Sequence, residues 1–403
     1  MRTALLALMV VLSACGSSPG AIAQSPIHPT ATAVDTPHST TASLATPSST
    51  VAPIHVTPPA SGLLIAVVQN VVASGCCGGE PTGVSSDTVA IYGFDGALKA
   101  SAKYQRRQLP PIGNAAVVLQ APALVAGSGL YYIDGSARVW VLHPDSKSNV
   151  VASFPQKGQP YEIWFAVKPD GTQVVAGVVT YDSVGSYFTL YTAPSGGTST
   201  QTVNSEGGGA PDPQMTNLPY PVGWVSAGPV AMDPSSLTTQ NAWFGGPLQV
   251  LTFAADGVHS SAVGGPDCRS ASITPSGLIP CISSKEVVSV RDTTGNILWT
   301  THVAGFSARS LCLSPNGQAI SDRHQASSSG GATWYMVVET QSGRIVQLPN
   351  GFRMEGWLDN NTVIGAITAP GSGDEGDLSW VSLDEPTTAH DLGFKGDFVG
   401  TLA

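Results

Sequence analysis

Three features of the sequence predict an all-β fold. A Pro-x-Gly turn recurs between short apolar segments, and seven strand-turn-strand patterns follow one another along the chain. No stretch of ten or more residues shows a helical period. Hairpins that repeat about every 40 to 60 residues are typical of the blades of a β-propeller. We therefore predict a single β-propeller of seven four-stranded blades.

The Pro-x-Gly turns predict the hairpin between the first two strands of a blade, a and b. Arg269–Gly277 and Arg309–Gly317 align without gaps at an offset of 40 residues, and Trp164–Gly171 shares their ending. In these turns Pro restricts one backbone dihedral angle, and Gly adopts the positive φ that closes a tight hairpin. Apolar segments on both sides of the turn then form the two strands.

A second hairpin pattern predicts strands c and d. In it an apolar, β-rich segment leads into a turn that is followed by another strand. The seven matches are Val89–Leu98, Val139–Asp145, Phe188–Gly197, Leu248–Gly257, Val287–Trp299, Tyr335–Val346 and Leu378–Asp384. One match per blade gives the predicted blade number.

The two ends of the predicted propeller fix how its ring closes. Leu63–Val68 precedes the first c/d pattern without a Pro-x-Gly turn before it, so we assign it as strand b of the first blade. Asp397–Ala403 follows strand d of the last blade. We predict that this C-terminal segment supplies the missing strand a and closes the ring.

The N-terminal segment has the pattern of a secretory signal. Arg2 precedes an apolar run from Ala4 to Leu12, which is too short for a permanent membrane helix. Leu12–Cys15 resembles a bacterial lipobox, and this resemblance implies cleavage after residue 14 and lipidation of Cys15. We therefore expect a signal peptide at 1–14 and a protein that is lipid-anchored to the cell membrane on its extracytoplasmic face.

Composition separates the rest of the chain into two parts. Residues 15–61 are rich in Ser, Thr, Pro and Ala and offer little to bury, so we predict a disordered tether. Residues 62–403 form the predicted propeller. The formal net charge is -10 and the only basic pair in the propeller is Arg106-Arg107, which argues against a nucleic-acid partner. We expect a monomer.

The blade patterns resemble known propeller families. Val167–Gly171 and Leu313–Gly317 are similar to the repeat of TolB-type and WD-repeat-like bacterial propellers. Val288–Trp299 is similar to the blade repeat of quinoprotein-like propellers. The resemblance implies the propeller fold, but such propellers include scaffolds, receptors, hydrolases and dehydrogenases, so it does not assign a function.

The connections from b to c and from d to a are predicted to share one face of the propeller, where ligands usually bind. The candidate ligand-face residues in these connections are Asp182, Arg323, His324, Asp374, Glu375 and Asp377. The last three offer carboxylate oxygens to calcium but lack the spacing of a calcium-binding loop. We interpret that cluster as a solvated loop and assign no metal, no cofactor and no catalytic residue.

Five cysteines follow Cys15, and an exported protein meets an oxidising environment. Cys268 precedes one predicted strand a and Cys281 lies in the following strand b, so the two are a candidate disulfide. Cys76 and Cys77 pair with each other in a vicinal disulfide or have no partner nearby. Cys312 aligns with a small inward-facing position, Ser272, and is expected to remain a buried thiol.

These observations predict a membrane-anchored lipoprotein whose propeller acts as a ligand-binding or protein-interaction module. The expected ligand is an extracytoplasmic protein or a glycan. The alternative is an extracytoplasmic propeller enzyme, either a quinone-cofactor oxidoreductase or a carbohydrate-active enzyme. A channel mouth lined by charged side chains would favour the enzyme, and an apolar one would favour binding.

Overall fold

The computed structural model describes fourteen stretches of the chain, all within the compact unit His55–Ala403. They are residues 62–69, 86–105, 123–155, 159–181, 185–197, 200–208, 220–232, 247–254, 257–270, 272–283, 287–302, 311–325, 333–367 and 377–402. Every regular element in these stretches is a β-strand, and the strands form seven antiparallel sheets. Within the same stretches no helix is long and apolar enough to cross a membrane.

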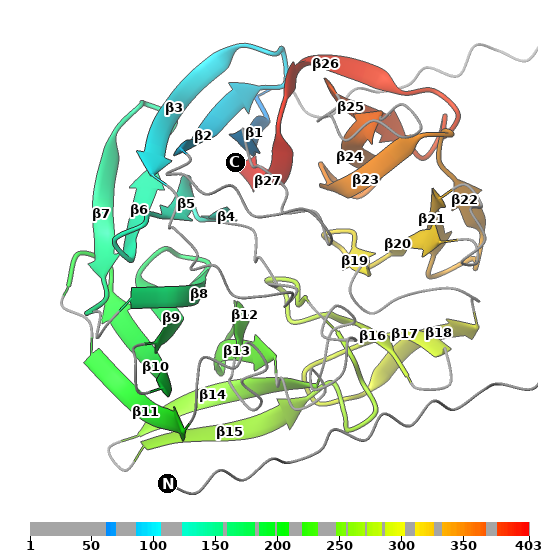
Figure 1. Cartoon of the computed structure of the whole chain (residues 1–403). Coiled ribbons are helices and arrows are strands. Elements are labelled where there is room, and N and C mark those ends of the chain that lie inside the picture. Colours follow the sequence, from blue (N-terminus) through cyan, green and yellow to red (C-terminus); the bar gives the residue numbers. More distant parts are fainter. Residues whose placement is uncertain are drawn as a thin grey trace, which may run out of the picture. The chain divides into compact units, whose positions relative to one another are not determined.

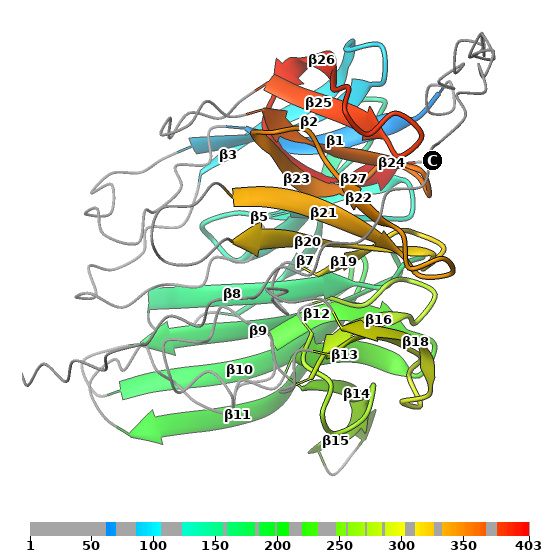
Figure 2. The same ribbon diagram turned by 90° about the vertical axis from the view of Figure 1, so that its right-hand side faces the viewer.

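The seven sheets follow one another around a closed ring and form the predicted β-propeller (Figure 1). Blade 1 contains β27 (Asp397–Leu402), β1 (Leu64–Gln69), β2 (Ser86–Gly93) and β3 (Leu98–Gln105). Blade 2 contains β4 (Ala123–Ala126), β5 (Gly129–Ile133), β6 (Arg138–Leu142) and β7 (Ser148–Ser153). Blade 3 contains β8 (Gln159–Val167), β9 (Gln173–Tyr181), β10 (Gly185–Pro194) and β11 (Thr200–Gly208). Figure 2 shows these last four strands side by side in a view turned by 90°.

The other four blades complete the ring. Blade 4 contains β12 (Tyr220–Val225), β13 (Gly228–Met232), β14 (Leu248–Ala254) and β15 (Gly257–Val263). Blade 5 contains β16 (Ile279–Ile282), β17 (Val287–Arg291) and β18 (Ile297–His302). Blade 6 contains β19 (Cys312–Leu313), β20 (Ala319–Gln325), β21 (Thr333–Glu339) and β22 (Ile345–Gln347). Blade 7 contains β23 (Phe352–Trp357), β24 (Thr362–Ile367), β25 (Asp377–Ser382) and β26 (His390–Lys395).

The C-terminal strand closes the ring as the sequence predicts. β27 pairs antiparallel with β1, with Leu64 opposite Leu402 and Val68 opposite Asp397. β1 pairs on its other edge with β2, so β27 is strand a of blade 1 and β1 is strand b. The first and last segments of the propeller are therefore held in one sheet.

The predicted hairpins are present at both kinds of turn. Gly171, Gly277 and Gly317 end the Pro-x-Gly turns with φ of +73°, +84° and +70°, which L-residues with a side chain rarely adopt. In blade 3 the turn is closed by a hydrogen bond of 2.7 Å from the Gly171 N–H to the Lys168 carbonyl. Each of the seven predicted c/d patterns also overlaps strand c of its blade, and strand d begins within the pattern or follows it in the chain.

The core lies between neighbouring sheets. One buried cluster packs Trp164 and Leu190 of blade 3 against Trp224 and Leu248 of blade 4. Another packs Ile65 of blade 1 against Ile364 of blade 7, across the closure of the ring. Burial of one such aliphatic side chain stabilises a fold by about 1.5 to 3 kcal/mol, so the blades stabilise one another.

Candidate functional site

The innermost strands of the described blades present a mainly apolar surface. In the six four-stranded blades strand a lies next to the ring's centre (Figure 1). Half-buried side chains of these innermost segments pack on the clusters between blades. The apolar half-buried side chains on these innermost segments are Leu124, Val125, Val222, Ile273, Cys312, Met354, Phe398 and Val399. A surface of this kind can hold a ligand, but its chemistry must come from the few polar groups within it.

A β-bulge recurs in four of these innermost strands. In β8, β12, β23 and β27 one residue has no opposite partner in the register, and these unpaired residues are Tyr161, Val222, Glu355 and Val399. A bulge bends its strand and redirects the side chain at that position. Glu355 is the one charged residue among these four.

In β12, β23 and β27 the bulged residue is followed by a glycine that approaches the next blade. A Cβ on Gly223 would lie 2.6 Å from Ile273, one on Gly356 2.5 Å from Phe398, and one on Gly400 3.1 Å from Val125. A side chain at Gly223 or Gly356 would force Ile273 or Phe398 to move, and one at Gly400 would require a smaller shift of Val125. The glycine therefore allows the innermost segments of neighbouring blades to approach each other closely.

Glu355 uses this position to connect blades 7 and 1. Its Oε1 accepts a hydrogen bond of 2.6 Å from Arg353 Nη2, and its Oε2 accepts one of 2.7 Å from the backbone N–H of Phe398. The same Arg353 nitrogen lies 3.3 Å from Asp397 Oδ1. Three charged groups, Arg353, Glu355 and Asp397, thus meet at the seam where β23 lies near β27.

Burial differs within this charged group. The Glu355 side chain is only 11% exposed, whereas those of Arg353 and Asp397 are 40% and 44% exposed. Burial raises the pKa of Glu355 above its ordinary value, and this outweighs the opposing effects of the Phe398 N–H and the Arg353 guanidinium. A shielded acid with a raised pKa beside two accessible charges is a common property of functional sites.

The structure places some of the predicted ligand-face residues and leaves others outside its described stretches. Asp377 begins β25, is exposed and lies 3.8 Å from the Lys395 ammonium. Arg323 and His324 lie within strand β20, opposite Tyr335 and Trp334, and not in a loop as the sequence suggested. The strand extends further than expected because it pairs along its whole length with β21.

The remaining candidate residues lie outside the described stretches. They are Cys15, Cys76, Cys77, Asp182, Asp374 and Glu375. Their roles in lipidation, in a vicinal disulfide and on the ligand face therefore stay predictions. Within the described stretches no group of three or more His, Cys, Asp or Glu side chains could hold a metal ion.

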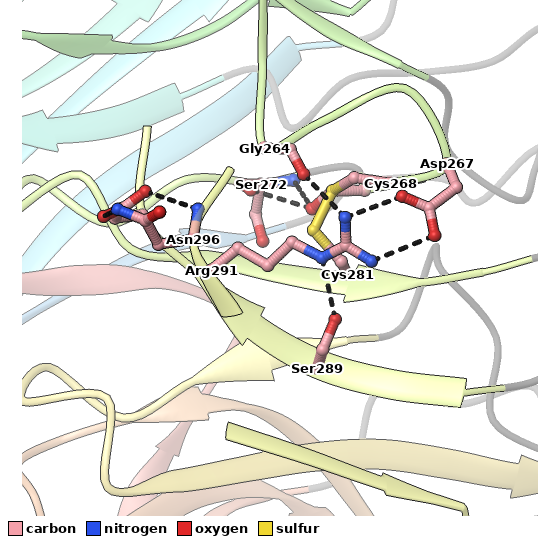
Figure 3. The surroundings of a disulfide bond; sticks show 10 residues. Gly264, Asp267, Cys268, Ser272, Cys281, Ser289, Arg291 and Asn296 are labelled. Atoms are coloured by element: carbon pink, nitrogen blue, oxygen red, sulfur yellow. Dashed lines mark hydrogen bonds and ion pairs between the residues drawn. A yellow bond between two sulfur atoms is a disulfide. The ribbon is translucent and has the colours of Figure 1, made fainter. Parts of the chain in front are cut away.

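The predicted pair Cys268 and Cys281 is joined by a disulfide in blade 5, with their Cα atoms 5.0 Å apart (Figure 3). It lies beside the bridge between Arg269 and Ile282, which is all that remains of strand a in this blade. Arg291 stabilises the segment that precedes Cys268. Its guanidinium donates to the Gly264 carbonyl at 2.9 Å and to both carboxylate oxygens of Asp267 at 2.7 and 3.2 Å.

Cys312 is the one free thiol among the cysteines that the structure describes. Burial raises its pKa to about 11, so at neutral pH it is not ionised. The side chain packs on the cluster between blades 6 and 7. This environment fits the structural role predicted for it and not a nucleophilic one.

Sequence inspection missed the charged group at the seam. One sequence signal could have revealed Glu355. In three innermost strands the bulged residue is followed directly by glycine: Val222-Gly223-Trp224, Glu355-Gly356-Trp357 and Val399-Gly400-Thr401. Aligning these three segments shows Glu355 at a position where the other two have Val. Arg353 and Asp397 carry no such signal, because only the meeting of β23 and β27 brings them together.

The longest connections between strands lie at one edge of the blades, where the lengths range from 1 to 17 residues. Those of β1 to β2, β3 to β4 and β13 to β14 have 16, 17 and 15 residues. They all run from b to c or from d to a, so their ends leave the sheets at the same edge. Between the named strands at the opposite edge, from a to b and from c to d, connections have at most 7 residues.

Comparisons with known proteins agree with the fold and extend no further. No protein-family model matches the sequence. No curated protein matches it either. Similar solved structures include TolB from Acinetobacter baumannii, at 14% identity over 85% of this chain and 66% of that chain, with a TM-score of 0.37.

Two further solved structures have comparable similarity. BamB from Moraxella catarrhalis is 13% identical over 68% of this chain and 72% of that chain, with a TM-score of 0.36. A protein from Lactobacillus plantarum is 14% identical over 84% of this chain and 98% of that chain, with a TM-score of 0.43. Likeness at this level carries no argument about activity, and the seven-bladed fold rests on the sheet topology itself.

Proposed function

We propose that this protein is a lipid-anchored, extracytoplasmic binding module whose propeller recognises a protein or a glycan. The observation that carries the proposal is the unequal length of the connections at the two edges of the blades. Rigid scaffolds commonly carry their recognition residues on the longer connections, since these can vary without disturbing the core. The edge at which strands b end and strands c begin is therefore the proposed recognition face.

The apolar innermost surface supports binding over catalysis. Its half-buried side chains are mostly aliphatic or aromatic, and three of its charged groups, Arg353, Glu355 and Asp397, contact one another at one seam. Apolar surface with a small number of placed polar groups is the usual composition of a binding site. The lipobox-like segment ending at Cys15 supports the proposed lipid anchor in the membrane.

Photo-cross-linking from defined positions tests the recognition face. A photoreactive amino acid is placed at Ser86 or Gln105, which are exposed at the long-connection edge, and in control variants at Ser195 or Gln341, which are exposed at the short-turn edge. We expect cross-linked adducts in intact cells from the first pair only. Equal adducts from both pairs, or none from the first, would contradict the proposal.

Lipid labelling tests whether the protein is anchored to the membrane through Cys15. Cells that express the full chain are fed a radioactive fatty acid, and detergent-phase partition of the protein is measured. We expect label and detergent partition for the unaltered protein and the loss of both in Cys15→Ser. Label retained in that variant would show that the anchor is elsewhere.

A second candidate function, a carbohydrate-active enzyme, is favoured by one observation. Glu355 is a shielded acid with a raised pKa, as a general acid requires, and Asp397 lies near the same guanidinium. Loss of glycoside cleavage in Glu355→Gln, with a melting temperature that does not fall, would support this function. If the unaltered protein binds a saccharide but does not cleave it, the protein is not an enzyme for that saccharide.

A further inference from the structure

Glu355 occupies a position where the repeat of the fold would tolerate an apolar side chain. The equivalent bulged residues of blades 4 and 1 are Val222 and Val399, which pack on the neighbouring core clusters. A buried carboxylate costs free energy through lost hydration, and an ion pair often only compensates for that cost. The charged side chain at this position therefore adds little net stability, and a role in binding accounts for it better.

The groups beside Glu355 define what a ligand would meet. Arg353 Nη2 is a donor, and the carboxylates of Glu355 and Asp397 are acceptors that share it at 2.6 and 3.3 Å. Because Arg353 and Asp397 are 40% and 44% exposed, a ligand can reach a donor and an acceptor side by side. Neighbouring hydroxyl groups, each of which donates and accepts, match this arrangement.

The surroundings of the charged group are apolar and partly aromatic. Phe398, whose N–H binds Glu355, packs its half-buried ring against Gly356, and Met354 and Val399 flank the same strands. A saccharide ring presents apolar C–H faces together with its hydroxyls, so it can contact an aromatic ring and charged groups at once. A peptide backbone offers no comparable row of hydroxyls.

The charge of the group limits the ligand further. Two carboxylates oppose one guanidinium, so an anionic ligand would meet repulsion close to its contact with Arg353. A cationic ligand would meet the guanidinium that already lies between the carboxylates. A neutral ligand avoids both penalties.

We propose that Arg353, Glu355 and Asp397 form a binding site for a neutral saccharide, held through adjacent hydroxyl groups and the ring of Phe398. The inference rests on the proposed binding function and specifies its ligand class. The site lies at the seam of blades 7 and 1, where strands d end and strands a begin. It is thus at the same edge as the proposed recognition face.

Titration with defined saccharides tests the site. The full-length lipidated protein in detergent micelles is titrated with maltotriose, cellotriose, mannotriose, chitotriose and trigalacturonate, and binding is followed by saturation-transfer NMR and calorimetry. We expect at least one neutral trisaccharide to bind and trigalacturonate not to bind. Hydrogen bonds to charged groups contribute enough that Arg353→Gln and Glu355→Gln should each weaken binding about tenfold or more.

Matched variants separate a lost site from a lost fold. Arg344 and Glu339 form another ion pair, in the c/d turn of blade 6 at the opposite edge. We expect Arg344→Gln and Glu339→Gln to bind as the unaltered protein does. Glu355→Gln keeps an acceptor for the Phe398 N–H, so its melting temperature at pH 7 should not fall.

The outcomes distinguish this inference from the proposal on which it rests. No binding of any neutral trisaccharide, binding of trigalacturonate alone, or binding unaffected by both seam variants would each overturn the saccharide site. Cross-linked adducts from Ser86 and Gln105 without saccharide binding would support the recognition face and reject only the saccharide as its ligand. If neither adducts nor saccharide binding were observed, both the recognition face and the saccharide site would be rejected.

Discussion

Asp134 and Glu355 are both shielded carboxylates, but their partners differ in number. Asp134 accepts hydrogen bonds from the N–H groups of Ser136 and Arg138, the Arg138 guanidinium and the Trp140 indole, at 2.8 to 3.1 Å. Glu355 has the Arg353 guanidinium and one backbone N–H. The first carboxylate organises a turn in blade 2. The second is less fully compensated, so its charge costs the fold more.

Replacement of Glu355 by Gln should stabilise the protein near neutral pH. The pKa of Glu355 is raised in the folded state, so its stabilising contribution is complete below about pH 4.5 and is lost as the pH rises through the folded pKa. Glu355→Gln removes that loss. We expect a free energy of unfolding higher by about 1 kcal/mol at pH 7 and no gain at pH 4, measured by urea denaturation. An equal effect at both pH values would contradict this.

Blade 5 shows how a disulfide can support a sheet that lacks a full first strand. Six blades have four strands within the described stretches, whereas strand a of blade 5 is one bridge between Arg269 and Ile282. The Cys268–Cys281 bond lies directly beside that bridge, and Arg291 binds Gly264 and Asp267 next to it. Covalent and ionic contacts here replace ladder hydrogen bonds.

Removal of this disulfide should destabilise the protein more than removal of the free thiol. The bond spans a sequence separation of 13 residues, for which chain-entropy models predict about 3 kcal/mol. We expect a loss of this size in the double variant Cys268→Ser, Cys281→Ser, measured from urea unfolding midpoints. Cys312→Ser is the control and should lose about 1 kcal/mol. Equal losses would argue against a special role for the bond.

At the scale of the whole molecule, stability depends on closing the ring. β27 comes from the C-terminus, supplies strand a to the N-terminal blade, and buries Leu402 in the cluster between blades 1 and 2. The seam also contains the contacts of Glu355 and Arg353 with Phe398 and Asp397. Loss of one terminal strand would therefore open the core on both sides of blade 1.

Truncation after Gly396 should abolish cooperative unfolding or lower stability by more than about 3 kcal/mol, since it removes a buried Leu and several ladder hydrogen bonds. Truncation after Leu402 removes only Ala403 and should have no such effect. Thermal melting and limited proteolysis of the two variants provide the comparison. Indistinguishable melting of the two would mean that the ring does not need β27.

The sequence by itself determined the hairpins, the blade number and the way the ring closes. The turns at Pro-Asp-Gly171 and Pro-Asn-Gly317 and the apolar strands beside them depend on residues that are close in the chain. They can therefore be recognised from the sequence. The Cys268–Cys281 pair was accessible for the same reason, because it spans one hairpin. The loop assignment of Arg323 and His324 failed because strand length depends on the pairing partner β21.

Only the tertiary structure brought Arg353, Glu355 and Asp397 together. Arg353 and Asp397 are 44 positions apart and belong to strands of different blades. Their meeting depends on a bulge that redirects Glu355, a glycine that admits Phe398, and the closing of the ring that places β27 after β23. Local patterns specify each strand, but contacts between strands a exist only once all seven blades are assembled, which is why the candidate site emerged from the fold.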